Sequence, residues 1–308
     1  MTPSIDLHGR VAIVTGAGRG LGRAYAIALA AAGAAVVVND LDEDGARATV
    51  QAIAGAGGRA VAEIAAVGSS DVADALIALA LREFGRLDVL CTNAGVLRDR
   101  VLWKMTDEDF DLVIDTHLRG TFTCARAAAI AMREQEQGGR ILVVGSPAGQ
   151  RGNFGQTNYA AAKAGIAAFA RTWAMELARS AVTVNAIIPT AWTAMTASIP
   201  AYAPLVERVA RGEGLPAAVR QQHGVGLPED CAALVVFLAS DAAAGITGQC
   251  IGIGGDRLSL WSHPGELIFE LREGGWSAEQ IAERWPKAFA GAEQSYGIEF
   301  AELDLETP

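Results

Sequence analysis

The stretch Val11–Gly22 reads VAIVTGAGRGLG and decides the fold. Its first part, Val11–Thr15, is a short apolar run with the β-branched composition of a buried strand. A glycine-rich turn follows at once, and a helical pattern begins at Leu21 and continues to Ala32. Glycines in such a turn let the backbone approach a pyrophosphate, to which the helix N-terminus presents free N–H groups. Strand, turn and helix in this order predict the phosphate loop of a dinucleotide-binding unit, and an ordinary surface turn is the alternative.

The same alternation of short apolar runs and helical segments continues along the chain. Strands are expected at Val11–Thr15, Val36–Asn39, Ala60–Ile64, Val89–Thr92, Arg140–Gly145, Val182–Ile188 and Cys250–Ile253. Helices are expected at Leu21–Ala32, Asp42–Ala54, Asp71–Phe84, Asp107–Glu134 with a break near Gly120, Tyr159–Ala178 and Glu229–Ala239. This pattern predicts an α/β fold, a Rossmann-like, doubly wound sheet of seven parallel strands with helices on both faces.

Two segments depart from the alternation. Residues 190–226 contain three prolines and no clean period, which is typical of a lid, a binding loop or a disordered segment. We therefore predict a catalytic domain over 1–255 that includes this lid, and a helical C-terminal extension over 256–308. In the extension, Ser277 and Gln280 predict a capping box, and Pro286 is expected to end that helix. The extension is expected to pack on its own domain or on a neighbouring subunit.

Composition excludes several classes of protein. The chain has 308 residues, of which 51% are hydrophobic and 19% charged, so neither a disordered protein nor a small disulfide scaffold is expected. A formal charge of −10 provides no basic surface for nucleic acid. The four cysteines lie far apart, which is not metal-site spacing and fits a reducing, cytoplasmic compartment. No apolar run is long enough for a membrane span, and the first ten residues do not resemble a signal peptide.

Asp40 ends the second expected strand and predicts the choice of cofactor. A carboxylate at that place accepts both hydroxyls of the adenosine ribose and repels a 2′-phosphate. NAD is therefore expected rather than NADP. Arg19, beside the phosphate loop, keeps the alternative open, because a guanidinium there favours a 2′-phosphate.

Tyr159 and Lys163 are separated by one helical turn, which places a phenol and an ammonium on one face of a helix. A nearby cation is expected to lower the pKa of the tyrosine, so Tyr159 is a candidate general acid/base for an alcohol or ketone oxygen. An exposed helix pair is the alternative.

Ser146 directly follows the fifth strand, where a hydroxyl is expected to hydrogen-bond the substrate oxygen. Asn93 follows the fourth strand and is expected to tie strand ends together, with Gly95 under the cofactor.

In these motifs the chain resembles the classical short-chain dehydrogenase/reductase family from about Leu7 to Gly255. The matching features are T-G-x-x-x-G-x-G at Thr15–Gly22, N-A-G at Asn93–Gly95, the strand-end Ser146, and Y-x-x-x-K at Tyr159–Lys163. The resemblance implies that Tyr159 transfers the proton, Lys163 lowers its pKa and binds the nicotinamide ribose, and Ser146 polarises the substrate oxygen. It also implies cofactor contacts from Gly16, Arg19, Gly20, Leu21, Gly22, Asn93, Gly95, Pro189 and Thr193. No metal is expected.

One departure from the family concerns His117, which stands where the family usually has a helical asparagine. Imidazole both donates and accepts hydrogen bonds, so His117 is a candidate anchor for a proton-relay water, and a purely structural histidine is the alternative. A second departure is the missing Asp-Val pair that commonly holds adenine, at Ala65–Gly68.

The chain is also similar to a subgroup of the family, the dehydrogenase unit of the peroxisomal multifunctional β-oxidation enzyme. The similar stretches are Val38–Leu41, Leu97–Asp99, His117–Phe122 and Gly152–Gln156. This similarity implies a bulky hydrophobic substrate such as a (3R)-hydroxyacyl-CoA or a 17β-hydroxysteroid. Another secondary alcohol, terpenoid or aromatic, and a non-catalytic NAD-binding scaffold remain alternatives.

The lid supplies candidate substrate contacts, in particular Trp192, Met195 and Tyr202, unless it packs on the protein's own surface. Several arginines are candidates for binding CoA phosphates: Arg98, Arg100, Arg151, Arg208 and Arg211. The family commonly assembles through its two long helices, so a homodimer or homotetramer is expected.

Overall fold

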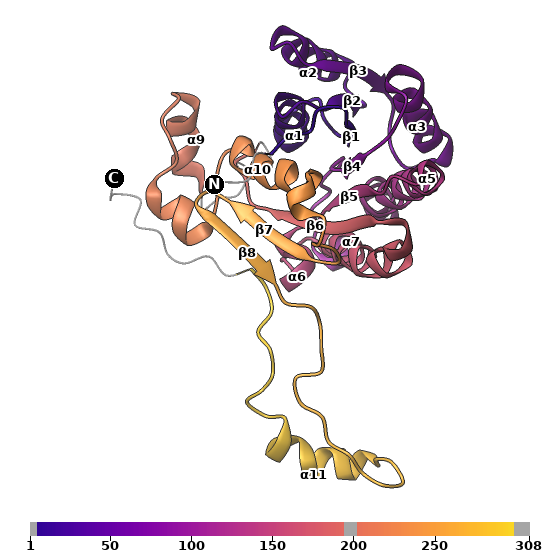
Figure 1. Cartoon of the computed structure of the whole chain (residues 1–308). Coiled ribbons are helices and arrows are strands. Elements are labelled where there is room, and N and C mark those ends of the chain that lie inside the picture. Colours follow the sequence, from indigo (N-terminus) through magenta and orange to yellow (C-terminus); the bar gives the residue numbers. More distant parts are fainter. Residues whose placement is uncertain (1–4, 194–201, 299–308) are drawn as a thin grey trace.

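A computed structural model of the chain describes residues 5–193 and 202–298. Its strands are β1 (Val11–Thr15), β2 (Ala35–Asp40), β3 (Arg59–Ile64), β4 (Val89–Thr92), β5 (Gly139–Val144), β6 (Val182–Pro189), β7 (Cys250–Gly254) and β8 (Arg257–Trp261). They form one sheet in the order β3-β2-β1-β4-β5-β6-β7-β8 (Figure 1). The seven predicted strands are all present and parallel, within a residue or two of the expected bounds.

The eighth strand was not predicted. β8 runs antiparallel to β7, with Cys250 opposite Trp261 and Gly254 opposite Arg257. It therefore belongs to the sheet, although its residues fall within the segment that the sequence indicated as the extension. The two-residue turn between the strands makes this pairing local, so it needs no crossover helix.

Helices cover both faces of the sheet. They are α1 (Gly20–Ala31), α2 (Glu43–Gly55), α3 (Ser70–Phe84), α4 (Asp107–Val113), α5 (Gly120–Gln135), α6 (Pro147–Arg151), α7 (Thr157–Glu176), α9 (Ala203–Ala210), α10 (Pro228–Ala239) and α11 (Ala278–Ala288). Helices α3, α5 and α7 share one apolar core with the sheet, and α1, α2 and α10 share the other. Near-continuous apolar strands, such as β1 with all its residues buried, are what a sheet covered on both faces requires.

One expectation about the helices is confirmed and another is wrong. The predicted break near Gly120 is a π-helical turn, Ile114–Arg119, that directly precedes this glycine. The prediction that Pro286 ends the last helix is wrong, because α11 continues to Ala288. Pro286 lacks only its own N–H, and the Phe289 N–H still closes the final turn on the Trp285 carbonyl at 2.9 Å. The predicted capping box of Ser277 and Gln280 is present.

The strand order reverses between β1 and β4. The chain builds outward from β1 to β3 on one side, and then from β4 to β7 on the other. In open α/β sheets, ligands bind beyond the carboxyl ends of the strands at such a switch point. The phosphate loop follows β1 and Asn93 follows β4, so both lie at this place.

The C-terminal residues leave the compact part of the molecule. After β8 the chain extends away from the sheet, forms α11 at the far end and returns (Figure 1). We call residues 262–294 the arm. Among the described residues, no helix combines the length and apolar character that crossing a bilayer requires.

A buried carboxylate fixes the start of the central strands. Asp88 is 6% exposed, accepts the Val11 N–H at 2.8 Å and pairs with the Arg86 guanidinium through 2.8 and 2.5 Å contacts. Asp88→Ala leaves the buried Val11 N–H unpaired, and we expect it to lower the free energy of unfolding by about 2–4 kcal/mol. Urea denaturation measures this loss.

The control is Glu83→Ala, which removes only the exposed pair with Arg82 and is expected to cost less than about 1 kcal/mol. Equal stability changes in the two variants would contradict the role given to Asp88.

Candidate active site

The phosphate loop after β1 is closed on one side and open on the other. Gly16 and Gly20 have φ of +63° and +54°, a left-handed conformation that favours glycine. A Cβ on Gly22 would lie 2.1 Å from the Gly16 carbonyl oxygen, so the loop is folded tightly against the start of α1. A Cβ on Gly20 would meet nothing nearer than the Thr193 methyl at 3.9 Å. This open side leaves backbone room for a pyrophosphate, so the loop fits a dinucleotide.

Asp40 lies beside this loop at the end of β2. One carboxylate oxygen accepts the Gly18 N–H at 2.8 Å, and the other accepts the Asp42 N–H at 3.0 Å. These bonds hold the carboxylate at the place where a dinucleotide-binding fold contacts the adenosine ribose. Arg19, at the N-cap of α1, is exposed.

Asn93 joins the ends of the two central strands. Its amide donates to the carbonyl oxygens of Thr15 and Gly16, both at 3.1 Å. The Thr15 hydroxyl in turn accepts the backbone N–H groups of Asn93 and Ala94, also at 3.1 Å. The predicted tie between strand ends therefore exists, and it fixes the phosphate loop against the β4 edge.

The three candidate catalytic side chains converge beyond β5. Ser146 is the N-cap of α6, where its hydroxyl oxygen accepts the Ala148 N–H at 3.2 Å, and its hydroxyl lies near enough to Tyr159 to affect the pKa of that phenol. The Lys163 ammonium donates to the Val144 carbonyl at 2.6 Å and lies 5.5 Å from the centre of the Tyr159 ring. The structure thus brings a hydroxyl, a phenol and an ammonium together at the sheet edge that ligands occupy.

The structure does not show the expected lowering of the Tyr159 pKa by Lys163. Burial raises the pKa of Tyr159, the nearby Ser146 hydroxyl opposes this rise, and the negative charge of Asp99 adds to it. Burial also lowers the pKa of Lys163 to about 7. The physical reason is desolvation, which disfavours the phenolate and the ammonium alike.

His117 lies in the π-helical turn before α5, with 2% of its surface exposed. Its Nε2 is 3.0 Å from the Val96 nitrogen and 2.8 Å from the Val96 oxygen. Its ring meets that of Tyr159 edge to face, with centroids 5.2 Å apart and planes at 89°. A Cβ on Gly95 would lie 2.2 Å from His117 Cε1, so the glycine admits the ring.

The lid residues pack mainly on one another. Trp192 and Tyr202 are 9% and 1% exposed, with ring centroids 5.9 Å apart, and the Tyr202 hydroxyl is 3.0 Å from His223 Nδ1. Their cluster includes apolar residues of α9 and of the following segment: Leu205, Leu215, Val219 and Val225. Met195 lies outside the described residues. Thr193 approaches the phosphate loop at Gly20, and Pro189 ends β6 beside β7.

Most of the arginines proposed for CoA phosphates already have protein partners. Arg100 pairs with Asp109 at 2.5 Å, and Arg151 donates to the Ser295 hydroxyl at 2.8 Å. The lid arginines Arg208 and Arg211 both pair with Glu213. Arg98 is exposed and donates to the carbonyl of its neighbour Leu97 at 2.7 Å. A CoA phosphate would therefore compete with existing ion pairs.

Two positions that sequence reasoning missed hold the catalytic helix. Asn158 is fully buried and donates to the Arg98 and Asp109 carbonyls at 3.1 and 3.0 Å. A Cβ on Gly149 would lie 2.5 Å from the Lys163 carbonyl carbon, so α6 packs directly on α7. The available signals were an asparagine next to Tyr159 at a helix start and a glycine close after Ser146.

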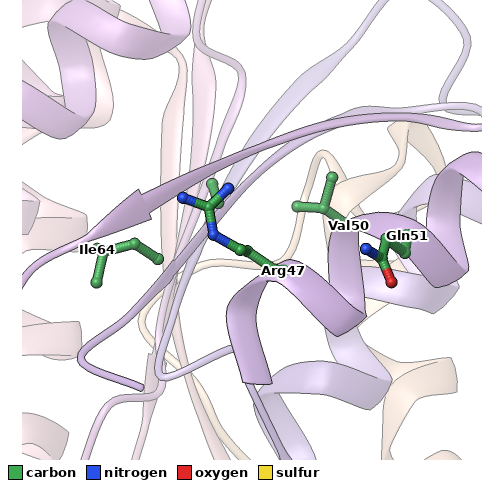
Figure 2. A pocket seen from close by; sticks show the side chains of 5 residues that line it. Arg47, Val50, Gln51 and Ile64 are labelled. Atoms are coloured by element: carbon green, nitrogen blue, oxygen red, sulfur yellow. The ribbon is translucent and has the colours of Figure 1, made fainter. Parts of the chain in front are cut away.

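A hollow of about 240 Å³ lies elsewhere, between α2 and the edge strand β3. Figure 2 shows Arg47, Val50 and Gln51 of α2 facing it, with Ile64 on β3. It contains none of the reacting groups, so it is separate from the candidate active site.

Comparisons with known proteins agree with this geometry. The family model described as short chain dehydrogenase matches residues 10–202. The hydroxyacyl-CoA dehydrogenase ChsB1 of Mycobacterium tuberculosis is 41% identical over 315 residues, which cover 96% of this chain and 94% of that protein. The peroxisomal multifunctional enzyme type 2 of Drosophila melanogaster is 50% identical over 200 residues, which cover 62% of this chain and 33% of that protein.

The crystal structure of a short chain dehydrogenase from Mycobacterium avium has the same fold. It matches with a TM-score of 0.82 and 34% identity, over 97% of this chain and all of that one. These similarities confirm the predicted family resemblance and the Rossmann-like fold. Members of the family are oxidoreductases that act on CH–OH groups with a nicotinamide cofactor. The chain belongs to the short-chain dehydrogenase family.

Proposed function

We propose that the protein is an NAD-dependent dehydrogenase that interconverts a bulky hydrophobic secondary alcohol and its ketone. The observation that carries this proposal is the convergence of Ser146, Tyr159 and Lys163 at the sheet edge that also holds the phosphate loop. A non-catalytic NAD-binding scaffold has no need of such a set.

In the proposed mechanism, the phosphate loop, Asp40 and Lys163 would hold a nicotinamide dinucleotide, which would supply a hydride acceptor for the carbinol carbon when bound. Tyr159, as phenolate, accepts the hydroxyl proton of the alcohol, so that the C–O bond becomes a carbonyl. Ser146 hydrogen-bonds the same oxygen and orients it. Lys163 stabilises the phenolate and binds the nicotinamide ribose, which gives its buried ammonium further partners besides the Val144 carbonyl. The reverse sequence reduces a ketone.

The choice of NAD rests on Asp40. Its carboxylate is held beside Gly18 by a 2.8 Å hydrogen bond, so it supports two ribose hydroxyls and repels a 2′-phosphate. Arg19 is exposed at the same loop and is the group that would favour NADP.

The proposed substrate is a (3R)-hydroxyacyl-CoA, with a 17β-hydroxysteroid as the alternative. The name of ChsB1, whose similarity extends over 96% of this chain, favours the acyl-CoA. The protein partners of Arg100, Arg151, Arg208 and Arg211 argue against the acyl-CoA, because these arginines are already engaged. The assay is NADH formation from NAD with each substrate in turn, and turnover of neither would point to another secondary alcohol.

The first kinetic prediction concerns Tyr159. Tyr159→Phe keeps the ring against His117 but removes the group that takes the proton. We expect kcat/KM to fall about 10²–10⁴-fold, with NADH binding unchanged. Steady-state kinetics and NADH fluorescence titration measure the two quantities.

Tyr25→Phe is the matched control, because the Tyr25 hydroxyl is buried among described residues without a hydrogen-bond partner. It should leave kcat/KM within about twofold, since no hydrogen bond is lost. A Tyr159→Phe variant that is as active as Tyr25→Phe would contradict the proposed proton transfer.

A second prediction concerns the cofactor. Asp40→Asn removes the negative charge that accepts the ribose hydroxyls and repels a 2′-phosphate. We expect the ratio of kcat/KM for NAD to that for NADP to fall about 10- to 100-fold. Asp42→Asn is the control, because Asp42 carries a similar charge nearby but makes no capping bond at α2. Equal ratios in the two variants would refute the role of Asp40.

We further propose that the chain forms a homodimer or homotetramer. The outer face of α5 and α7 exposes large apolar side chains, with Phe122, Ile130 and Met175 at 40%, 51% and 73%. Phe122 and Phe169 join the two helices at 6.4 Å between ring centroids, so this face is continuous. A second copy of the chain would bury it.

The arm also has exposed apolar side chains, and we propose that a neighbouring subunit covers them. Its helix α11 has no buried residue, although Ile281 and Trp285 are apolar. Both ends of the arm are fixed to the body, through β8 and through the Gly297 N–H on the Arg151 carbonyl at 2.7 Å. The apolar face of the arm is exposed on its own chain, so in an oligomer a second copy is the available cover.

A third prediction follows for the arm. The double variant Ile281→Glu and Trp285→Glu charges the apolar face of α11, and we expect a smaller oligomer by light scattering on a sizing column. Lys287→Gln, on an exposed side chain of the same helix, is the control and should keep the mass. An unchanged mass in the double variant would show that the arm makes no contact between subunits.

The proposed location is the cytoplasm. The four cysteines are free and buried, and burial raises the pKa of each thiol. Such cysteines act as small apolar residues, which suits a reducing compartment.

A further inference from the structure

Another hollow lies at the end of the sheet opposite the candidate active site. It has a volume of about 340 Å³ and lies where β5 and β6 begin. We call it the basal hollow. Its lining includes one residue from the start of each strand and four alanines of the surrounding segments: Arg140, Thr183, Ala174, Ala178, Ala181 and Ala244. Ser146 follows the carboxyl end of β5, so the length of that strand separates the basal hollow from the reacting groups.

Arg140 brings a buried guanidinium to the basal hollow. Its side chain is 8% exposed. Nη1 donates to the Gly139 carbonyl at 3.0 Å, whereas the contacts of Nε and Nη2 with the Ser240 carbonyl are 3.4 and 3.5 Å long. Hydrogen bonds from N–H to oxygen are usually about 2.7–3.2 Å long, so both contacts with Ser240 are weak. The guanidinium therefore keeps hydrogen-bonding capacity for a further acceptor.

The charges around Arg140 do not balance. The charged groups that act on it are Arg10, Asp241 and Asp88. Asp241 pairs with Arg10 at 2.5 Å and lies 3.5 Å from Arg140. Asp88 pairs with Arg86. In this part of the described chain three guanidiniums thus share two carboxylates. A buried charge without a counter-charge is costly, and an anion bound beside it offsets that cost.

Thr183 adds a hydroxyl to the same place. It pairs with Arg140 in the register of β5 and β6, so both side chains lie on one face of the sheet. Thr183 is 7% exposed, and its Oγ1 is buried without a hydrogen-bond partner among the described residues. A rotation about χ1 exchanges the places of the hydroxyl and the methyl group, which brings the hydroxyl to a ligand beside Arg140.

The end of α10 does not account for Arg140. A structural role there would be to bind the last carbonyl groups of that helix. Arg10 already does so, because its Nη1 donates to the Ala239 carbonyl at 2.9 Å and its Nη2 pairs with Asp241. Arg140 is therefore the guanidinium whose charge is left for another partner.

We propose that the basal hollow binds a small monocarboxylate. Its carboxylate pairs with the Arg140 guanidinium and accepts the Thr183 hydroxyl, and its short hydrocarbon chain lies against the alanine methyl groups. A guanidinium offers two parallel N–H groups that match the two oxygens of a carboxylate. The alanines leave room and an apolar wall for a chain of a few carbons. This inference goes beyond the proposed function and does not rest on it.

The test is isothermal titration calorimetry of the full chain with butyrate, which we expect to bind with a millimolar Kd. Butyramide has the same shape without the charge and should bind at least about tenfold more weakly. Acetate lacks the chain and should bind at least about threefold more weakly. Butyramide that binds as tightly as butyrate would refute the role of Arg140. Acetate or inorganic phosphate that binds as tightly would refute the apolar part of the site.

A variant that fills the basal hollow locates the binding. Ala178 is an exposed lining residue, so Ala178→Leu occupies the hollow without disturbing the core. We expect the Kd for butyrate to rise at least about tenfold. Ala54→Leu is the control, because Ala54 is exposed on α2 and away from the hollow, and it should change the Kd less than about twofold. Butyrate that fails to bind the wild type, or that binds Ala178→Leu as tightly as the control, would overturn the proposal.

Thr183→Val tests the hydroxyl separately. Valine keeps the shape of the side chain, and no hydrogen bond within the described chain is lost, so the midpoint of thermal unfolding should not fall. The Kd for butyrate should rise about threefold to tenfold, because the carboxylate loses one hydrogen bond. An unchanged Kd would remove Thr183 from the site.

Discussion

The structure depends on a hydrogen-bonded tie between the ends of β1 and β4. Thr15 and Asn93 are far apart in the chain, but the Asn93 amide and the Thr15 hydroxyl join their strands at the switch point. The same amide holds the Gly16 carbonyl, so the phosphate loop has a fixed position relative to β4. Because β5 pairs with β4, the tie also determines where Ser146 lies relative to the loop.

Burial shapes the chemistry at this edge. Tyr159 and Lys163 reach the site from α7, which Asn158 ties to the Arg98 carbonyl and on which α6 packs through Gly149. Desolvation shifts the pKa of both side chains. Desolvation moves the pKa of the phenol up and that of the amine down, which makes each charged form dependent on the hydrogen bonds offered to it. A site of this kind responds strongly to the partners that substrate and cofactor bring.

The sequence predicted the parts of the fold that follow local patterns. The seven parallel strands, Asn93 at the switch point and the capping box of Ser277 all depend on neighbouring residues or on short motifs. β8 and the end of α11 were missed, because a five-residue edge strand that follows a two-residue turn was included in the C-terminal extension, and because a proline near a helix end usually stops the helix. The electrostatics were also missed, because the spacing of Tyr159 and Lys163 does not reveal how far desolvation shifts the pKa of each. The partners of two arginines were missed as well, because the residue types alone did not indicate that Arg100 pairs with Asp109 or that Arg151 donates to the distant Ser295 hydroxyl.

The central claim is that a hydride leaves the carbinol carbon of a secondary alcohol at this edge. The most direct measurement uses a (3R)-hydroxyacyl-CoA deuterated at C3 and, in parallel, a 17β-hydroxysteroid deuterated at C17. Mass spectrometry then follows the label after turnover with NAD. The account predicts one deuterium in the reduced nicotinamide formed from the accepted substrate and none when Tyr159→Phe replaces the wild type over the same time. Reduced cofactor without deuterium, formed during turnover of the labelled substrate, would contradict it.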